Sequence, residues 1–109
     1  MGWTPPQIAE NGYLSYPFGT MSLVPRISAF YGIVIYTYWR DHEPPHFHAR
    51  YGEQEALVVI EDGEVYAGSL APRALRLVRE WRRLHTADLD RAWQAAYRRE
   101  DPGTIEPLP

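Results

Sequence analysis

Three of the four histidines in the chain lie close together, at His42, His46 and His48. Histidine is a common metal ligand and titrates near neutral pH, so such a cluster suggests metal binding or acid–base chemistry. His46 and His48 alternate along a segment expected to be extended, which places both side chains on one side, and Arg50 follows on that side. Asp41 lies directly before the cluster and adds a carboxylate. The segment is therefore the first candidate for a functional site.

The first interpretation of this segment is a divalent-metal site. The candidate ligands are His42, His46 and His48, with Asp41 as the alternative to His42. Two histidines at alternate strand positions can chelate one ion, and a third imidazole or a carboxylate completes a set typical of transition metals. No motif in the sequence requires a cofactor, so the expectation of a divalent metal depends on this cluster alone.

The second interpretation is catalysis on a phosphodiester, with or without a metal. His46 or His48 would act as general acid or base, and Arg50 would stabilise the charge that develops. These three residues are the catalytic candidates of a small ribonuclease or other phosphodiesterase, with RNA as its partner. In the third interpretation the cluster is structural, and Arg50 pairs with Glu55 across two strands. The residue types alone leave all three interpretations open.

The composition restricts the class of protein. The chain has 109 residues, a formal net charge of -3 and no cysteine. This length fits a single domain, and the absence of cysteine excludes disulfides and cysteine-ligated zinc. The negative charge argues against a general nucleic-acid binder. No long apolar run or leader-like segment is present, so we expect a cytoplasmic protein without a membrane partner.

The chain divides into three parts. Residues 1–24 contain scattered Pro and Gly and predict an irregular N-terminal arm, with Met21 as an alternative translation start. Residues 25–101 carry the regular patterns of a single α+β domain. Residues 102–109 form a Pro-rich tail.

Strand signals fill the first half of the domain. Residues 30–39 are rich in β-branched and aromatic side chains on both faces, which predicts a strand that is central or lies at an interface. Strands at 46–51 and 54–61 are expected to pair through a turn at Gly52 and Glu53. The Asp62-Gly63 turn then predicts a fourth strand over 64–69.

The turn at Gly52 and Glu53 also predicts which side chains share a face, because directly paired residues point the same way. The expected core face holds Phe47, Ala49, Tyr51, Ala56, Val58 and Ile60. The expected second face holds His46, His48, Arg50, Glu55, Leu57 and Val59, and Tyr66 joins it if Asp62-Gly63 brings Val59 opposite Tyr66. A register slip of one residue would exchange the two sets.

Two amphipathic helices follow the strands. Apolar residues at helical spacing begin after Pro72 and again after Thr86, which is expected to cap the second helix. The first stripe is Ala74, Leu77, Val78, Trp81 and Leu84, and the second is Leu89, Ala92, Trp93, Ala96 and Tyr97. Both stripes must be buried, so we predict an α+β fold in which a small antiparallel meander of about four strands is followed by two helices packed on one face.

Several segments resemble a known family. They are 30–35, Asp41-His42, the run Pro44-Pro45-His46-Phe47-His48-Ala49-Arg50-Tyr51-Gly52, Glu55-Ala56, and Ala74-Leu75-Arg76-Leu77-Val78 with Trp81. In these segments the chain is similar to the short bacterial family catalogued as domain of unknown function 4160. The resemblance implies a small cytoplasmic protein, often encoded beside a second small protein, an arrangement associated with toxin–antitoxin modules. It supplies no catalytic residues.

The sequence and the resemblance together favour an interaction module, and the resemblance points to one component of a toxin–antitoxin-like pair. Its partner would be a small protein or a second copy of the chain, because the strand at 30–39 is apolar on both faces. A ribonuclease or phosphodiesterase and a divalent-metal-binding protein are the alternatives.

Overall fold

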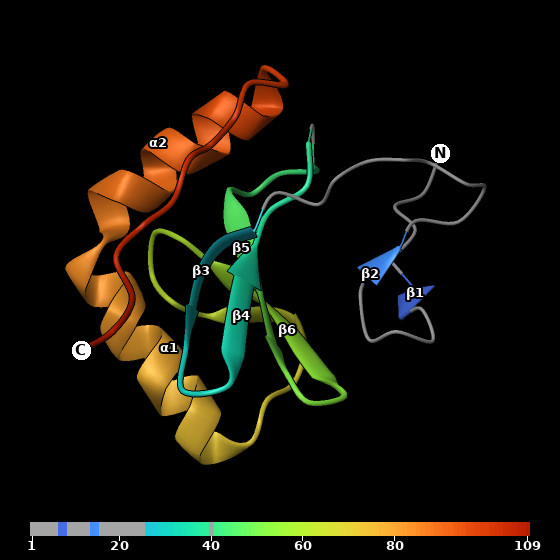
Figure 1. Cartoon of the computed structure of the whole chain (residues 1–109), viewed down its shortest axis with the longest axis vertical. Helices are drawn as coiled ribbons and strands as arrows, with labels where there is room; N and C mark the ends of the chain where they lie inside the picture. Colours follow the sequence, from blue (N-terminus) through green and yellow to red (C-terminus); the bar gives the residue numbers. More distant parts are fainter. Residues whose placement is uncertain (1–6, 9–13, 16–25, 40) are drawn as a thin grey trace.

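The computed structural model describes residues 7–8, 14–15, 26–39 and 41–109. In this part of the chain a five-stranded antiparallel sheet is followed by two helices (Figure 1). The sheet is a meander in the order β3-β4-β5-β6-β7, and β1 (Gln7–Ile8) pairs with β2 (Leu14–Ser15) separately. The α+β fold is confirmed, with five strands in the sheet where about four were expected. The elements are β3 (Arg26–Phe30), β4 (Ile33–Tyr36), β5 (His46–Tyr51), β6 (Gln54–Val59), β7 (Val65–Gly68), α1 (Pro72–Leu84) and α2 (Thr86–Tyr97).

Residues 30–39, expected to form one strand, contain the end of β3 and the whole of β4. Tyr31 and Gly32 both have positive φ, at 50° and 81°, and reverse the chain between β3 and β4. Phe30 therefore pairs with Ile33 across this turn. The sequence hides the reversal because apolar residues continue on both sides of Gly32. The strand β4 is internal to the sheet, as its two apolar faces predicted.

The hairpin of β5 and β6 has the predicted register. Tyr51 pairs with Gln54, and His46 pairs with Val59. Most of the expected core face is buried, namely Phe47, Ala49, Ala56, Val58 and Ile60. Tyr51, at the end of this face, is partly exposed. The correct register is what places the histidines of β5 on the opposite face.

The register predicted between β6 and β7 is wrong. Val58, not Val59, is the last β6 residue that pairs with β7. Its partner is Val65, and a bulge lies beside this pair. The turn is wider than two residues, because the Val59 N–H donates to the Glu64 carbonyl and the Gly63 N–H donates to the Val59 carbonyl. Tyr66 nevertheless reaches the histidine cluster, as the contacts below show.

Both helices lie along one side of the sheet (Figure 1). Trp81 of α1 is fully buried, and its ring packs 5.4 Å from Phe30 and 5.6 Å from Phe47, centroid to centroid. Thr86 is the first residue of α2 and does not cap it, since its hydroxyl donates to the Arg82 carbonyl. No helix in the described part of the chain is both long and apolar enough to cross a membrane.

The tail after α2 forms neither helix nor strand but belongs to the core. The Ile105 N–H donates to the Ile27 carbonyl on β3 at 2.7 Å, and the Trp81 indole N–H donates to the Glu106 carbonyl at 2.8 Å. The side chains of Ile105 and Leu108 are buried. Most of the expected N-terminal arm, including Met21, lies outside the described residues.

Candidate metal centre

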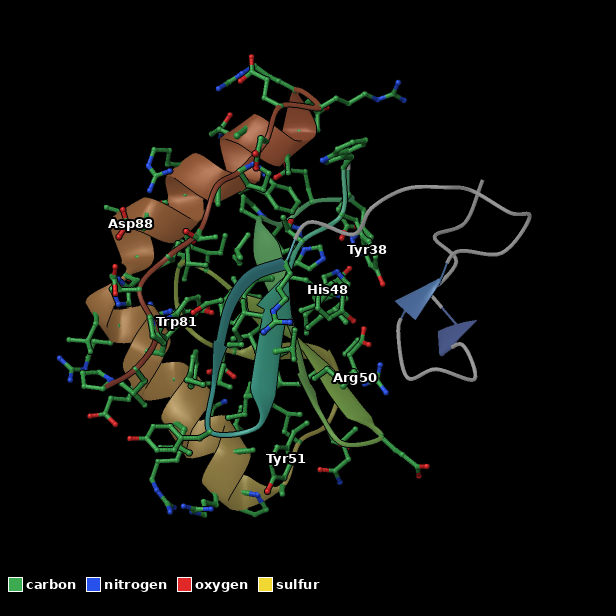
Figure 2. The ribbon with its side chains drawn as sticks, in the orientation of Figure 1. Tyr38, His48, Arg50, Tyr51, Trp81 and Asp88 are labelled. Carbon is green, nitrogen blue, oxygen red and sulfur yellow. The ribbon has the colours of Figure 1, made fainter. Side chains whose placement is uncertain are left out.

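The two histidines of β5 lie on the sheet face opposite α1, and His46 also contacts Trp93 of α2. They alternate with Phe47, whose ring packs against Trp81, so their own side chains point the other way. Figure 2 shows His48 on one side of the sheet and Trp81 on the other. Both imidazoles are fully buried. A buried polar side chain needs a partner, and the partners of these rings define the site.

Asp41 provides the atom on which both rings converge. It lies in the loop between β4 and β5, and its carboxylate is fully buried. One oxygen, Oδ1, accepts the backbone N–H of His42 at 2.8 Å. The other, Oδ2, lies 3.0 Å from Nε2 of His46 and 2.9 Å from Nε2 of His48. Loop and strand thus bring a carboxylate and two imidazoles together.

The remaining nitrogen of each ring faces an oxygen. Nδ1 of His46 lies 2.7 Å from the Pro44 carbonyl, and Nδ1 of His48 lies 3.2 Å from Oε2 of Glu55. Both oxygens are acceptors, so each Nδ1 carries the proton and donates it. In a neutral ring this leaves the lone pair on Nε2, which is the atom facing Asp41.

This arrangement suits a cation. With neutral rings, two nitrogen lone pairs and a carboxylate oxygen would converge without a proton between them. Nε2 of His46 is buried and makes no hydrogen bond among the described residues, although it lies 3.0 Å from Asp41 Oδ2. Nε2 of His48, in contrast, forms a hydrogen bond with the same oxygen at 2.9 Å. The orientation of metal-bound histidines by a carboxylate or a backbone carbonyl is a common feature of protein metal sites. Glu55 and Pro44 supply those two acceptors here.

The distances also fit. One ligand atom from each of Asp41, His46 and His48 lies within 4.8 Å of the other two. Tetrahedral ligands about 2.1 Å from zinc are about 3.4 Å apart. The observed separations from Asp41 Oδ2 are slightly shorter, so a small outward shift of these side chains would admit an ion.

The charges of the cluster are strongly coupled. Burial alone would raise the pKa of Asp41, but the rings of His46 and His48 outweigh it and hold that pKa well below its usual range. Burial would lower the pKa of His48, but the Asp41 and Glu55 carboxylates outweigh it and raise the pKa. Burial opposes ionisation of Glu55 too, yet His48, Tyr36 and Arg50 lower its pKa. Two carboxylates are therefore ionised here, and the raised pKa of His48 favours a proton on the ring between them, which a bound ion would have to displace.

Aromatic rings surround the cluster. Tyr36 stacks on His48 at 5.0 Å between centroids, and Tyr38 meets the same ring edge-on at 4.3 Å. Burial, together with neighbouring Tyr38 and Glu55, raises the pKa of the Tyr36 hydroxyl, which therefore stays neutral. On the other side, His46 lies beside Trp93 of α2, with centroids 5.3 Å apart. These rings lower the local polarity and strengthen the electrostatic interactions inside.

The candidate site residues predicted from the sequence occupy three different places in the structure. His46 and His48 lie in the centre with Asp41. His42 lies at the rim, where its side chain is 30% exposed and its Nε2 is 3.6 Å from Asp41 Oδ1. Arg50 is on the same face but further along β5, and its Nε donates to the Gly52 carbonyl at 2.9 Å. Neither buried histidine faces solvent, where an external phosphodiester would have to bind.

Sequence reasoning missed the contact between Glu55 and His48. It paired Glu55 with Arg50, which lies directly opposite on β5. Arg50 does lower the pKa of Glu55, and the Glu55 carboxylate also reaches diagonally to His48, two residues away along β5. Long side chains commonly span such diagonal positions in antiparallel sheets, and this was the available signal.

The fold and the site together define a small α+β protein with a buried Asp-His-His cluster on the sheet face opposite α1. The chain belongs to the family described as domain of unknown function DUF4160, whose model matches residues 32–94. This confirms the resemblance inferred from the sequence, and the match includes Asp41, His46, His48 and Glu55. Comparison with curated proteins gave no match, and neither did comparison with solved structures.

Proposed function

We propose that the protein binds one divalent transition-metal ion through Asp41, His46 and His48. The observation that supports this most strongly is the shared orientation of the two β5 rings. Each directs Nδ1 at an oxygen acceptor and Nε2 at the same buried carboxylate oxygen. Imidazole with one carboxylate suits zinc and its first-row neighbours better than magnesium or calcium, which prefer oxygen ligands.

The ion would tie the loop between β4 and β5 to the sheet. Asp41 comes from the loop, whereas His46 and His48 come from the strand, so the ligands span residues 41–48. A chain of 109 residues without cysteine has few other means of reinforcing a small core. Metal binding would therefore contribute directly to folding stability.

Calorimetric titration of chelator-treated protein with zinc tests this proposal. We expect binding of one ion per chain, and we expect His48→Gln to abolish it because the variant loses one ligand and the partner of Glu55. The matched control is His85→Gln, which removes a histidine that lies outside the cluster and faces Asp88. Equal zinc binding by the two variants would rule the site out.

We also propose that the protein is an interaction module, for which a separate feature provides support. The strand β7 is at the sheet edge and pairs only with β6 among the described strands, and Tyr66 on it is half exposed. Unpaired strand edges recruit further strands from partners. Co-expression with a small protein encoded beside it, as the family resemblance implies, followed by size-exclusion chromatography with light scattering, tests for a complex. Growth inhibition relieved by that neighbour would identify a toxin–antitoxin-like pair, whereas a monomer that binds no neighbour would refute the interaction role.

A ribonuclease or other phosphodiesterase would need a different state of the same site. His46 and His48 are buried, so they would act on RNA only through a bound ion that keeps a position open for water. The coordination of that ion is therefore the feature that separates a structural role from a hydrolytic one.

A further inference from the structure

All three clustered histidines share one orientation. His42, like His46 and His48, has Nδ1 facing an oxygen, in its case the Glu43 carbonyl at 3.2 Å. Its Nε2 likewise faces the Asp41 carboxylate, at 3.6 Å from Oδ1. A carbonyl acceptor at Nδ1 leaves the lone pair on Nε2, as in the other two rings. Three imidazoles thus present the same kind of donor atom to one carboxylate.

We infer that His42 supplies a fourth ligand, so that the ion is held in a closed set of one aspartate and three histidines. This inference depends on the proposed metal site and specifies its chemistry. Closed four-ligand sets are typical of structural zinc, whereas catalytic zinc keeps a position for water.

The position of His42 fits this role. Its ring centroid is 4.8 Å from that of His46 and 5.5 Å from that of Tyr66, so it lies between the buried cluster and the exposed tyrosine. Its Nε2 lies 3.6 Å from Oδ1 of Asp41, whereas His46 and His48 face Oδ2, and it lies outside the group of ligand atoms that are all within 4.8 Å of one another. Its side chain is 30% exposed, and the fourth-ligand role requires the ring to rotate so that Nε2 moves from Oδ1 toward the ion.

The closed set has a structural consequence. Two ligands, Asp41 and His42, come from the loop, and two, His46 and His48, come from β5. The ion would then fix both ends of the turn that contains Pro44 and Pro45. The site would bind only the metal ion. The ion would have no open coordination position for a phosphodiester or for water.

Cobalt(II) in place of zinc tests the inference by a readout other than activity. Four-coordinate cobalt absorbs visible light far more strongly than five- or six-coordinate cobalt, and azide adds to a cobalt ion only where a position is open. We expect wild-type protein to bind cobalt with an intense spectrum that azide leaves unchanged. In His42→Ala, we expect weaker binding, by about tenfold or more, and a spectrum that responds to azide and is restored by added imidazole.

The matched control is Tyr66→Phe, which keeps a ring beside His42 and should behave as wild type. A wild-type cobalt spectrum that shifts with azide, or a His42→Ala variant with wild-type affinity and spectrum, would overturn the role of His42 and leave the proposed metal site intact. Failure of wild-type protein to bind cobalt at all would instead refute the metal site itself. Because the azide titration of wild type needs no variant, the test does not depend on whether His42→Ala folds.

Discussion

Glu55 and His48 face each other diagonally across the β5–β6 hairpin, with Oε2 and Nδ1 separated by 3.2 Å. The other nitrogen of the same ring lies 2.9 Å from Asp41. One imidazole therefore connects an outer carboxylate to an inner one, and its proton position follows from the outer contact. This chain of contacts distinguishes the cluster from a set of histidines that merely lie close together.

The first prediction concerns the inner carboxylate. Asp41→Asn keeps the size of the side chain but removes its charge, so we expect zinc stabilisation to disappear. In wild type, zinc at about 100 times its dissociation constant should add about 2.7 kcal/mol to the free energy of unfolding, or on the order of 10 °C in Tm. Thermal unfolding with and without zinc measures both values. Asp88→Asn is the control, since Asp88 pairs with Arg91 outside the cluster, and an equal zinc shift in Asp41→Asn would contradict the prediction.

The second prediction concerns the outer carboxylate. Glu55→Gln retains all proposed ligands but replaces the charged acceptor of the His48 Nδ1 proton. We expect zinc affinity to fall by about 10- to 100-fold while the stoichiometry stays the same, as for other outer contacts of metal-bound histidines. Competition with a chromogenic chelator gives the affinity. Glu53→Gln, in the exposed turn between β5 and β6, should bind as wild type, and an unchanged affinity in Glu55→Gln would show that this contact does not support the site.

The third prediction concerns how stability depends on pH. We expect the stability of the metal-free protein and the stabilisation by zinc to change in opposite directions as pH rises. The raised pKa of His48 means that, without metal, the folded protein binds more protons than the unfolded chain above about pH 6.5. Its contribution to stability is complete below that value and is lost as pH rises through the folded pKa. Asp41 and Glu55 have lowered pKa values, so their contributions are present above about pH 5 and are lost only in acid.

Zinc reverses this trend because protons compete with the ion for the imidazoles. We therefore expect the Tm in chelator to decline as pH rises above about 6.5, and the difference between zinc and chelator to widen over the same range. A zinc effect that shrinks as pH rises would contradict the assignment of the histidines as ligands.

Much of the fold follows from local signals in the sequence. The turn at Gly52 and Glu53 predicted the register of β5 with β6, and that register predicted which face carries His46 and His48. The turn at Tyr31 and Gly32 escaped prediction because the β-favouring residues on both sides outweighed the one signal of a break, the glycine inside the run. Local reasoning fails where the chain departs from the usual preferences of its residues.

The site was predicted only in part. Alternation along one strand brings His46 and His48 together, and this much can be read from spacing. The burial of Asp41 depends on how the loop between β4 and β5 folds back onto the sheet, which no periodicity encodes. The diagonal reach of Glu55 depends on side-chain rotamers rather than on strand register.

The fourth prediction concerns the tail. Ile105→Ala should lower the free energy of unfolding by about 2–5 kcal/mol, because it removes a buried side chain beside β3 and leaves a cavity. Urea unfolding followed by tryptophan fluorescence measures the change. Thr104→Ala, at an exposed neighbouring position, should change the stability by no more than about 0.5 kcal/mol. Similar values for the two variants would mean that the tail does not contribute to the core.

The measurement that tests the central claim most directly is native mass spectrometry with elemental analysis of protein purified without chelator. We predict that wild-type protein carries one divalent transition-metal ion per chain, and that Asp41→Asn and His48→Gln carry none. A wild-type protein that carries no ion, and that zinc neither binds nor stabilises, would contradict the claim. In that case Asp41, His46, His48 and Glu55 would form a protonated hydrogen-bonded network with a structural role.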